Sequence, residues 1–292
     1  MLNPFPLSSL NAFCFALWKK SRRWFYPFLS VAIALLIAIG QPMLAQAISL
    51  GDLIRGGVQV IQGIQVTRMS DAQEIDLGRQ INQQVSGQVR LLRNPQLTAY
   101  VNEIGQRLAA KSDRPNLPYT FQIVDDDAIN AFATMGGFVY VHTGLMKAAD
   151  NEAQLASVIS HEIGHITARH AIKQMGDVMK TQGFMSITGT NRSQVVNLGV
   201  QLARRLPHSR RAEYEADQTG LATFARAGYA PSEMAAFMQK LVRSRSVPTF
   251  LSTHPAAADR VVRLKEMSQT SSARGQDGLN SAAYKSRIQA LR

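Results

Sequence analysis

Hydrophobic residues recur every three or four positions along most of the chain after residue 70, and this spacing predicts helices. Ser70 and Gln73 match a capping box that begins the first helix, and Asn94 with Pro95 begins the second. The same spacing, with capping residues at its ends, predicts further helices over residues 150–174, 210–227, 231–241 and 256–267.

Two segments alternate like strands instead, over residues 119–124 and 138–141. Residues 175–200 are rich in glycine, methionine, serine and threonine. We expect an irregular, mobile excursion there, with Met175 and Met179 on a lid, a membrane-contacting loop or a plain linker. Together these segments predict an α+β fold that is mostly helical with a small sheet.

The first 47 residues carry a basic cluster, an apolar run and a small-residue site, in that order. Lysines and arginines at 19–23 precede the run at 24–40, and Ala45-Gln46-Ala47 follows it. This order is typical of a secretory signal, with an uncleaved membrane anchor as the alternative. Both the general and the twin-arginine export routes stay open. The predicted organisation is a leader over 1–47, an unassigned segment over 48–69, a folded domain over 70–267 and a loose polar tail over 268–292.

Composition and charge exclude several classes of protein. Hydrophobic residues make up 46% of the 292 and charged residues 18%, which excludes wholesale disorder. Cys14 is the single cysteine, so an internal disulfide and a zinc module built on several cysteines are excluded. The net charge of +12 suits anionic surfaces, and an exported chain meets a membrane surface first. A nucleic-acid partner would rest on charge alone and is not expected.

The segment His161-Glu162-Ile163-Gly164-His165 lies inside a predicted helix. Residues four apart on a helix lie one turn apart on the same face, so His161 and His165 can bind one zinc ion. Glu162 is turned by about 100° and lies beside the metal. There it can take a proton from a zinc-bound water. The motif therefore predicts one Zn²⁺ per chain, with Glu162 as catalytic base.

The third ligand decides the class of zinc site. A metzincin needs glycine and histidine three and six residues after His165, where this chain has Ala168 and Ala171. A gluzincin takes a glutamate from a later helix instead. Glu213 fits that position, and Asp217 on the same helix face can accept the other ring N–H of a ligand histidine.

Three polar residues near these motifs are not expected to bind the metal. His170 is turned away from His165 and is expected behind the ligands or at the surface. Glu215 points away from Glu213 and is interpreted as structural. His208 lies in an arginine-rich stretch and is expected at the surface.

The motifs resemble metallopeptidase family forty-eight, which contains HtpX and the CAAX prenyl endopeptidases. The resemblance covers about residues 70–265, and the loop Ser252-Thr253-His254-Pro255 is similar to the soluble, exported BepA-like branch. Met135 departs from the pattern, which often has proline before the two glycines. The several membrane spans of HtpX have no counterpart in this sequence. The resemblance rests on HEIGH at 161–165, EYEAD at 213–217, NAFATMGGFVYVHTGL at 130–145 and this loop.

The resemblance implies a zincin-type metallopeptidase domain over 70–267, in which an edge strand of the sheet borders the zinc cleft. His254 either donates to the developing oxyanion or occupies the open zinc position as a plug. In the BepA-like branch a histidine at this place approaches the metal, and a plain surface histidine is the alternative here. The implied roles are His161, His165 and Glu213 as zinc ligands, Glu162 as base and Asp217 behind a ligand histidine.

The strand after the glycine pair has a physical interpretation of its own. Two glycines let another backbone approach closely, and an exposed edge could take an extended substrate as an added strand. An ordinary buried strand is the alternative. The predicted substrate-binding residues are Gly136, Gly137, Phe138, Val139 and Tyr140.

These observations predict an exported zinc endopeptidase that hydrolyses misfolded or unassembled exported or membrane-associated proteins. Its expected place is the periplasm or an equivalent compartment. The alternative is a chaperone-like binding or assembly factor whose zinc site is latent behind His254. A basic surface binder without catalysis explains none of the motifs. The natural substrate, the cleavage specificity and the oligomeric state are left open.

Overall fold

The computed structural model describes residues 66–182, 192–271 and 275–291. The predicted leader over 1–47 and most of the unassigned segment that follows it lie outside the described residues. None of the helices in the described ranges combines the length and the hydropathy that crossing a membrane requires.

The first two described helices begin where the sequence predicts them. In α3 (Asp71–Ser86) the hydroxyl of Ser70 accepts the backbone N–H of Gln73, and the Gln73 side chain accepts the N–H of Ser70. In α4 (Pro95–Ala109) the side chain of Asn94 accepts a backbone N–H, and proline occupies the first turn. Local capping therefore sets both starting points.

Three short strands form one mixed sheet in the order β1–β3–β2. β1 (Thr120–Val124) runs parallel to β3 (Phe138–His142), and β2 (Ala131–Thr134) runs antiparallel to β3. The turn between β2 and β3 places Gly136 and Gly137 at φ values of 78° and 97°. Residues that carry a side chain rarely adopt this backbone conformation, so the turn requires both glycines.

The strand predicted over 138–141 is therefore the central strand, because both of its edges are paired. No sequence pattern predicts β2, because its four residues are too few to show an alternation. β2 pairs along one edge with β3 and also contacts α6 (Glu152–Thr167). The edge strand expected beside the cleft is β2.

The sheet separates two hydrophobic cores, because alternate side chains point to opposite faces. One face packs on α4 and α6, with Phe121, Ile123, Ala131, Val139 and Val141 among its buried residues. The other face packs on α3, α7 (His170–Gln182) and α8 (Arg192–Arg204). Its buried residues include Val124, Phe132, Phe138 and Tyr140.

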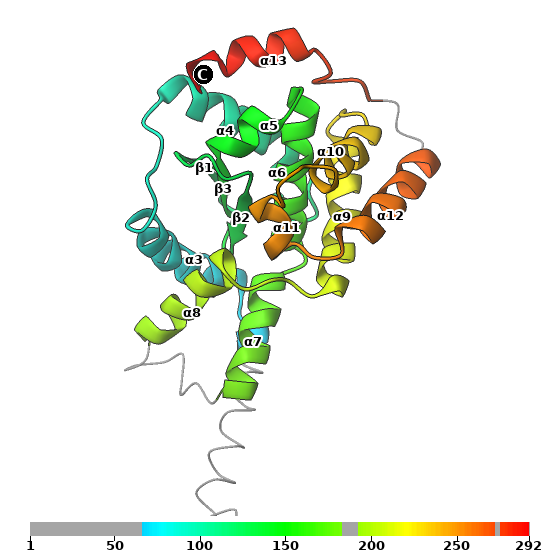
Figure 1. The fold of residues 1–292 in the computed structure, drawn as a ribbon. Coiled ribbons are helices and arrows are strands. Elements are labelled where there is room, and N and C mark those ends of the chain that lie inside the picture. The colour runs from blue at the N-terminus through cyan, green and yellow to red at the C-terminus, as the bar shows by residue number, and fades with distance from the viewer. Residues whose placement is uncertain (1–65, 183–191, 272–274, 292) are drawn as a thin grey trace, which may run out of the picture. The chain divides into compact units, whose positions relative to one another are not determined.

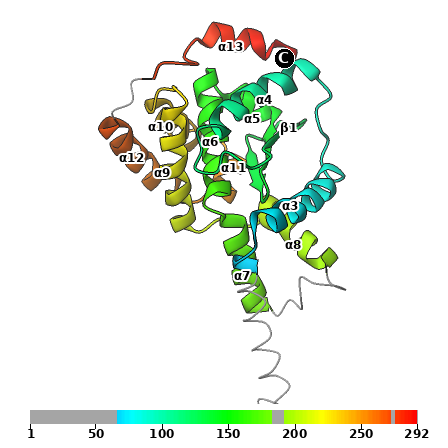
Figure 2. The same ribbon diagram turned by 180° about the vertical axis from the view of Figure 1, so that it is seen from behind.

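The helix α6 lies between the sheet and a second group of helices. α9 (Arg210–Arg226), α10 (Ser232–Val242) and α12 (Ala257–Thr270) lie on its other side, as Figures 1 and 2 show from opposite directions. Every residue of α6 from Ala153 to Ile166 is buried. A helix that is covered all round belongs to the interior of a domain.

Two glycines allow α6 and α9 to pack closely. A Cβ atom on Gly164 of α6 would lie 2.5 Å from the backbone oxygen of Ala216. A Cβ atom on Gly220 of α9 would lie 2.9 Å from the backbone oxygen of Ser160. Both distances are shorter than a carbon–oxygen contact allows, so the spacing of the two helices depends on glycine at both positions.

The helix predicted over 150–174 is divided in two. Asn151 caps α6, and Arg169 with φ of 57° ends it before α7 begins. The irregular excursion predicted over 175–200 is wrong for the described part, because α7 and α8 occupy most of it. Met175 and Met179 are buried in the second core and cannot form a soft surface loop. Residues 183–191 lie outside the described residues.

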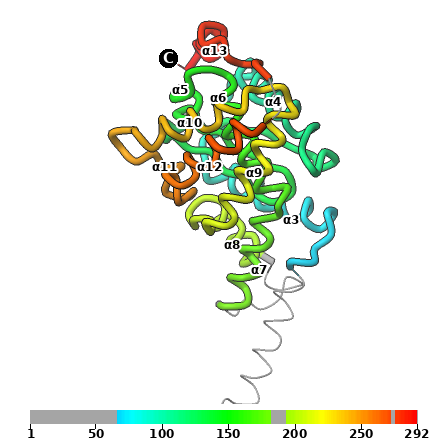
Figure 3. Tube along the Cα trace, turned by 90° about the vertical axis from the view of Figure 1, so that its right-hand side faces the viewer, coloured from blue at the N-terminus to red at the C-terminus, as the bar shows by residue number. Residues whose placement is uncertain are grey.

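The predicted loose tail is also wrong for residues 275–291. They contain α13 (Ser281–Arg287) and a final 3₁₀ turn (Gln289–Leu291). Tyr284 is buried and donates to the backbone oxygen of Met146 in α5 (Thr143–Ala148) at 2.7 Å. Figure 3 shows α13 at the end of the domain that holds α4 and α5, away from α7.

Candidate metal centre

Two histidines of α6 and one glutamate of α9 meet in the interior of the domain. Nε2 of His161 lies 3.0 Å from Nε2 of His165. Carboxylate oxygens of Glu213 lie 3.5 Å from Nε2 of His161 and 3.4 Å from Nε2 of His165. All three side chains are buried. The structure therefore brings together the two histidines of the motif and the glutamate predicted as third ligand.

Asp217 holds the ring of His161 from behind. Oδ1 of Asp217 lies 3.0 Å from Nδ1 of His161. With Asp217 ionised, Nδ1 carries a proton and donates, so Nε2 of His161 is the ring atom that can bind a metal. Glu213 and Asp217 are one turn apart on α9. The hydroxyl of Ser209 accepts the backbone N–H of Ala212, and this N-cap fixes where that helix starts.

Arg260 is a central residue of the site that the sequence analysis missed. Its buried guanidinium donates from Nε and Nη2 to the two oxygens of Asp217, at 2.7 Å each. Nη1 lies 2.5 Å from Oε2 of Glu213 and also donates to the backbone oxygen of His254. One planar fork of donors thus links Glu213 and Asp217 of α9 to the loop that carries His254.

Glu162 and His254 face each other beside this cluster. Nε2 of His254 lies 3.3 Å from Oε1 of Glu162. His254 follows the short helix α11 (Thr249–Thr253), and its ring stacks on Phe250 at a centroid distance of 4.1 Å. Ligand atoms of His254 and of the three predicted metal ligands all lie within 4.8 Å of one another. His254 is therefore buried at the centre and is not a surface histidine.

Burial and neighbouring charges move the pKa values of these groups in opposite directions. Burial raises the pKa of Glu213, but the charge of His254 and the histidine hydrogen bonds outweigh it and hold the pKa far below its usual range. Burial and Arg260 lower the pKa of His161, but hydrogen bonds to carboxylates outweigh them and raise it to about 9. For Glu162, burial raises the pKa and His254 brings it below normal. The carboxylates are thus ionised and can bind a cation.

Two further histidines lie against His165. Nδ1 of His170 is 2.8 Å from Nδ1 of His165, and its Nε2 is 3.2 Å from Oε2 of Glu215. His170 therefore lies behind a predicted ligand, the first of its two expected positions. His208 is half-buried and stacks on His165 at a centroid distance of 4.1 Å, so it lies against a predicted ligand and not only at the predicted surface position. Burial and the charge of His254 lower the pKa of His208 to about 4.

A comparison with known protein families agrees with this geometry. The family described as "Peptidase family M48" matches this chain over residues 95–268. The chain belongs to peptidase family M48. The family match confirms the predicted metalloprotease. The mostly helical fold with its small mixed sheet confirms the predicted α+β zincin-like domain.

Individual M48 relatives carry two kinds of name. The beta-barrel assembly-enhancing protease of Escherichia coli (strain K12) is 32% identical over 217 residues, which are 66% of this chain and 43% of that protein. Its namesake in Yersinia pestis is 34% identical over 210 residues, with the same shares. The mitochondrial metalloendopeptidase OMA1 of Arabidopsis thaliana is 33% identical over 158 residues, 52% of this chain and 32% of that protein. The chain thus spans less than half the length of these relatives.

The donor set of this M48 domain fits a zinc ion. Two imidazoles and one carboxylate are the protein ligands of catalytic zinc sites that keep a fourth position open. Oε1 of Glu213 is buried without a hydrogen-bond partner among the described residues, whereas Oε2 is held by the ion pair with Arg260. Buried polar atoms normally have a partner, and a divalent cation would supply one to the ligand atoms here.

A narrow cavity lies between the predicted metal site and the sheet. Glu162 and His165 line one side of it, and Ala133, Thr134 and Met135 of β2 and its turn line the other. The predicted addition of a substrate strand to β3 is wrong, because that strand is central and paired on both edges. Within the described part of the sheet, β2 is the edge strand beside the cluster. The residues predicted to bind substrate lie instead in the turn (Gly136, Gly137) and in β3 (Phe138, Val139, Tyr140).

Proposed function

We propose that this chain is a zinc metalloendopeptidase that hydrolyses peptide bonds of misfolded or unassembled exported or membrane-associated proteins. The observation that carries the proposal is the position of Glu162. It lies beside a buried cluster of two imidazoles and a carboxylate and on the wall of a cavity that reaches an edge strand. Family membership supports the same reaction class.

In this proposal His161, His165 and Glu213 hold the metal, and Asp217 keeps His161 in the tautomer that binds it. A bound zinc ion supplies a Lewis acid that polarises the scissile carbonyl and makes a water molecule acidic near pH 7. Glu162 takes the proton of the attacking water and passes it to the leaving amine. Arg260 holds the carboxylates of Glu213 and Asp217 and the backbone at His254 in one arrangement.

The edge strand indicates how an extended substrate binds. A peptide that pairs with β2 lies along the wall that Thr134 and Met135 share with Glu162. Main-chain hydrogen bonds select extended segments and depend little on their sequence. This mode of binding therefore suits segments of unfolded proteins. Relatives named for assembly of β-barrels make unassembled β-barrel proteins the first natural substrates to test. The basic and apolar pattern of residues 1–47 supports export, and the positive charge supports contact with a membrane surface.

The experiment compares wild-type protein with Glu162→Gln on an unfolded protein substrate, with zinc measured by elemental mass spectrometry. We expect one zinc per chain in both proteins and a loss of turnover of about 10²-fold or more in the variant. Glu103→Gln, at an exposed position of α4, is the matched control and should cleave normally. Normal cleavage by Glu162→Gln would contradict the proposed base.

The position of His254 favours a second candidate, a chaperone-like assembly factor with a latent zinc site. Nε2 of His254 is close enough to the three proposed ligands to occupy the fourth position itself. His254→Ala separates the alternatives in the same assay. A gating histidine predicts faster cleavage by the variant, and an oxyanion donor predicts slower cleavage. Zinc binding without cleavage in both proteins would favour the assembly factor.

A further inference from the structure

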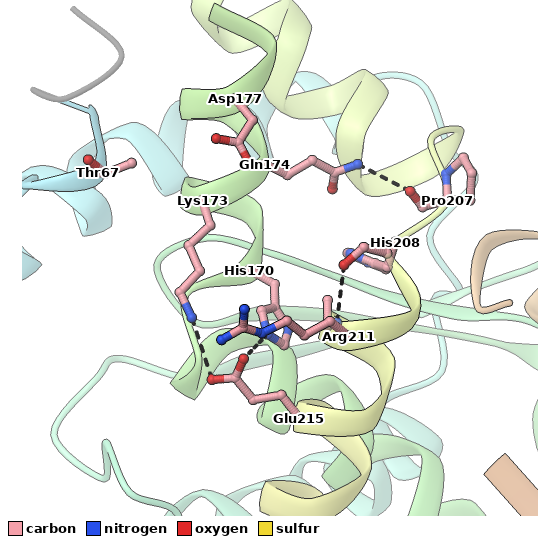
Figure 4. Close-up of a pocket in the computed structure, with 11 residues that line it drawn as sticks. Thr67, His170, Lys173, Gln174, Asp177, Pro207, His208, Arg211 and Glu215 are labelled. Carbon is pink, nitrogen blue, oxygen red and sulfur yellow. Dashed lines mark hydrogen bonds and ion pairs between the residues drawn. The ribbon is translucent and has the colours of Figure 1, made fainter. Parts of the chain in front are cut away.

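A chain of side chains leads away from His165 on the side opposite its Nε2 atom. Nδ1 of His165 contacts Nδ1 of His170 at 2.8 Å, and Nε2 of His170 contacts Oε2 of Glu215 at 3.2 Å. Lys173, one turn further along α7, lies 3.5 Å from the other oxygen of Glu215. His170 is 4% exposed, whereas Glu215 reaches solvent. Figure 4 shows His170, Glu215 and Lys173 converging on the wall of one cavity.

Only one arrangement of protons allows all of these contacts while His165 binds a metal through Nε2. His165 must then carry its proton on Nδ1 and donate it to Nδ1 of His170. Neutral His170 must in turn carry its own proton on Nε2, which faces the carboxylate of Glu215 and donates to it. Each hydrogen bond therefore fixes the tautomer of the next ring.

The local fold places His170 for this contact. Arg169, with φ of 57°, ends α6 and lets α7 start with His170, so the ring turns back toward His165. On one continuous helix the ring of His170 would point away from His165, because five residues correspond to a rotation of about 140° beyond one full turn. Glu215 comes from α9, the helix that also supplies Glu213. The two contacts, from His165 to His170 and from His170 to Glu215, form a relay that joins α6, α7 and α9 behind the ring of His165.

We propose that His170 and Glu215 are positioning residues that hold His165 in the tautomer and orientation in which Nε2 binds the metal. They do for His165 what Asp217 does for His161, but through a second imidazole. Neither residue lines the narrow cavity between Glu162 and β2, so neither is placed to touch substrate. The inference rests on the metal site of the proposed function.

The test measures zinc affinity by competition with a chromogenic chelator, using the full chain freed of metal. His170→Phe keeps a ring but removes both nitrogens, and the dissociation constant for zinc should rise about 10- to 100-fold. In His170→Asn the amide oxygen can still accept from Nδ1 of His165, so most of the affinity should return. Lys173→Gln is the control, because it leaves both relay hydrogen bonds in place and should bind zinc as wild type does.

A second measurement reports the tautomer itself. Nitrogen NMR of the histidine rings in the zinc-loaded wild type should show the proton of His165 on Nδ1 and that of His170 on Nε2. The opposite tautomer for either ring contradicts the relay.

The outcomes separate this inference from the proposed function. A wild-type chain that binds no zinc overturns both. Zinc binding by the wild type with equal affinity in a folded His170→Phe variant overturns the relay alone. If His170→Phe does not fold without metal, Glu215→Ala makes the same test at a partly exposed position. Weaker zinc binding by that variant supports the relay, and unchanged binding overturns it.

Discussion

At the scale of single residues, Arg260 carries a positive charge between two buried carboxylates. Removing one partner of a buried ion pair leaves uncompensated charge and costs about 3–5 kcal/mol. We expect Arg260→Met to lower the free energy of unfolding of the metal-free protein by that amount, measured by urea denaturation with a chelator present. Zinc should recover part of the loss, because a cation at Glu213 replaces part of the missing charge.

Arg263→Met is the matched control for this substitution. Arg263 lies on the same helix, is exposed, and places its guanidinium 4.4 Å from the ring centre of Tyr214. Its loss should cost about 1 kcal/mol or less. Equal destabilisation by the two variants would show that the buried position of Arg260 does not matter.

The effect of Arg260→Met should also depend on pH. Burial raises the pKa of Asp217, but Arg260 outweighs it, so the folded-state pKa lies below the usual 3.8. A depressed carboxyl pKa stabilises the fold at every pH above 3.8, and this contribution disappears as the pH falls through the folded-state value. The stability difference between wild type and Arg260→Met should therefore be constant near neutral pH and shrink in acid. A difference that grows in acid would contradict the ion pair.

Sequence reasoning could find residues whose chemistry follows from local spacing. The pairs His161 with His165 and Glu213 with Asp217 are each four apart on one helix, so helical geometry alone relates them. Arg260 is 43 residues from Asp217, and its position in a predicted helix resembled that of any surface arginine. Contacts made by tertiary packing leave no such periodic signal.

At the scale of elements, the close packing of α6 on α9 sets the position of Glu213 relative to the two histidines. Gly164→Ala would place a methyl group on the backbone of Ala216 and push the helices apart. We expect a loss of about 1–3 kcal/mol in stability and weaker zinc binding, measured by urea denaturation and chelator competition.

Gly87→Ala is the control for this substitution. Gly87 has φ of −77° and its nearest neighbouring atom would lie 3.6 Å from an added Cβ, so alanine fits. It should be neutral or slightly stabilising. Wild-type zinc affinity in Gly164→Ala would show that α9 can shift without disturbing the ligands.

The elements that the sequence predicted well are those with caps and long apolar periodicity. α3 and α4 begin at the predicted caps, and α9, α10 and α12 begin and end near the expected residues. The interruption of the helix at Arg169 was not predicted, because no glycine or proline marks it. α8 and the part of α7 after residue 174 were missed because the glycines, methionines, serines and threonines of residues 175–200 suggested a loop, whereas packing in the second core favours helix there.

At the scale of the whole described domain, the C-terminal segment completes the core although it lies beyond the family match at 95–268. Tyr284 fills a buried position against α4 and α5. Tyr284→Ala should lower the free energy of unfolding by about 3–5 kcal/mol. Tyr284→Phe keeps the ring and should cost only about 1 kcal/mol. Wild-type stability in Tyr284→Ala would mean that α13 is not held against the domain.

The complete burial of α6 determines the order in which parts of this protein open. Backbone amides exchange their hydrogens with solvent last where a helix is covered on every side. The amides of α6 should therefore exchange only when the whole domain unfolds, whereas those at the ends of α7 and α8 should exchange earlier. The helix that bears the proposed ligands would then be the most persistent part of the molecule. Heating should abolish metal binding and the cooperative fold in one step, at one temperature.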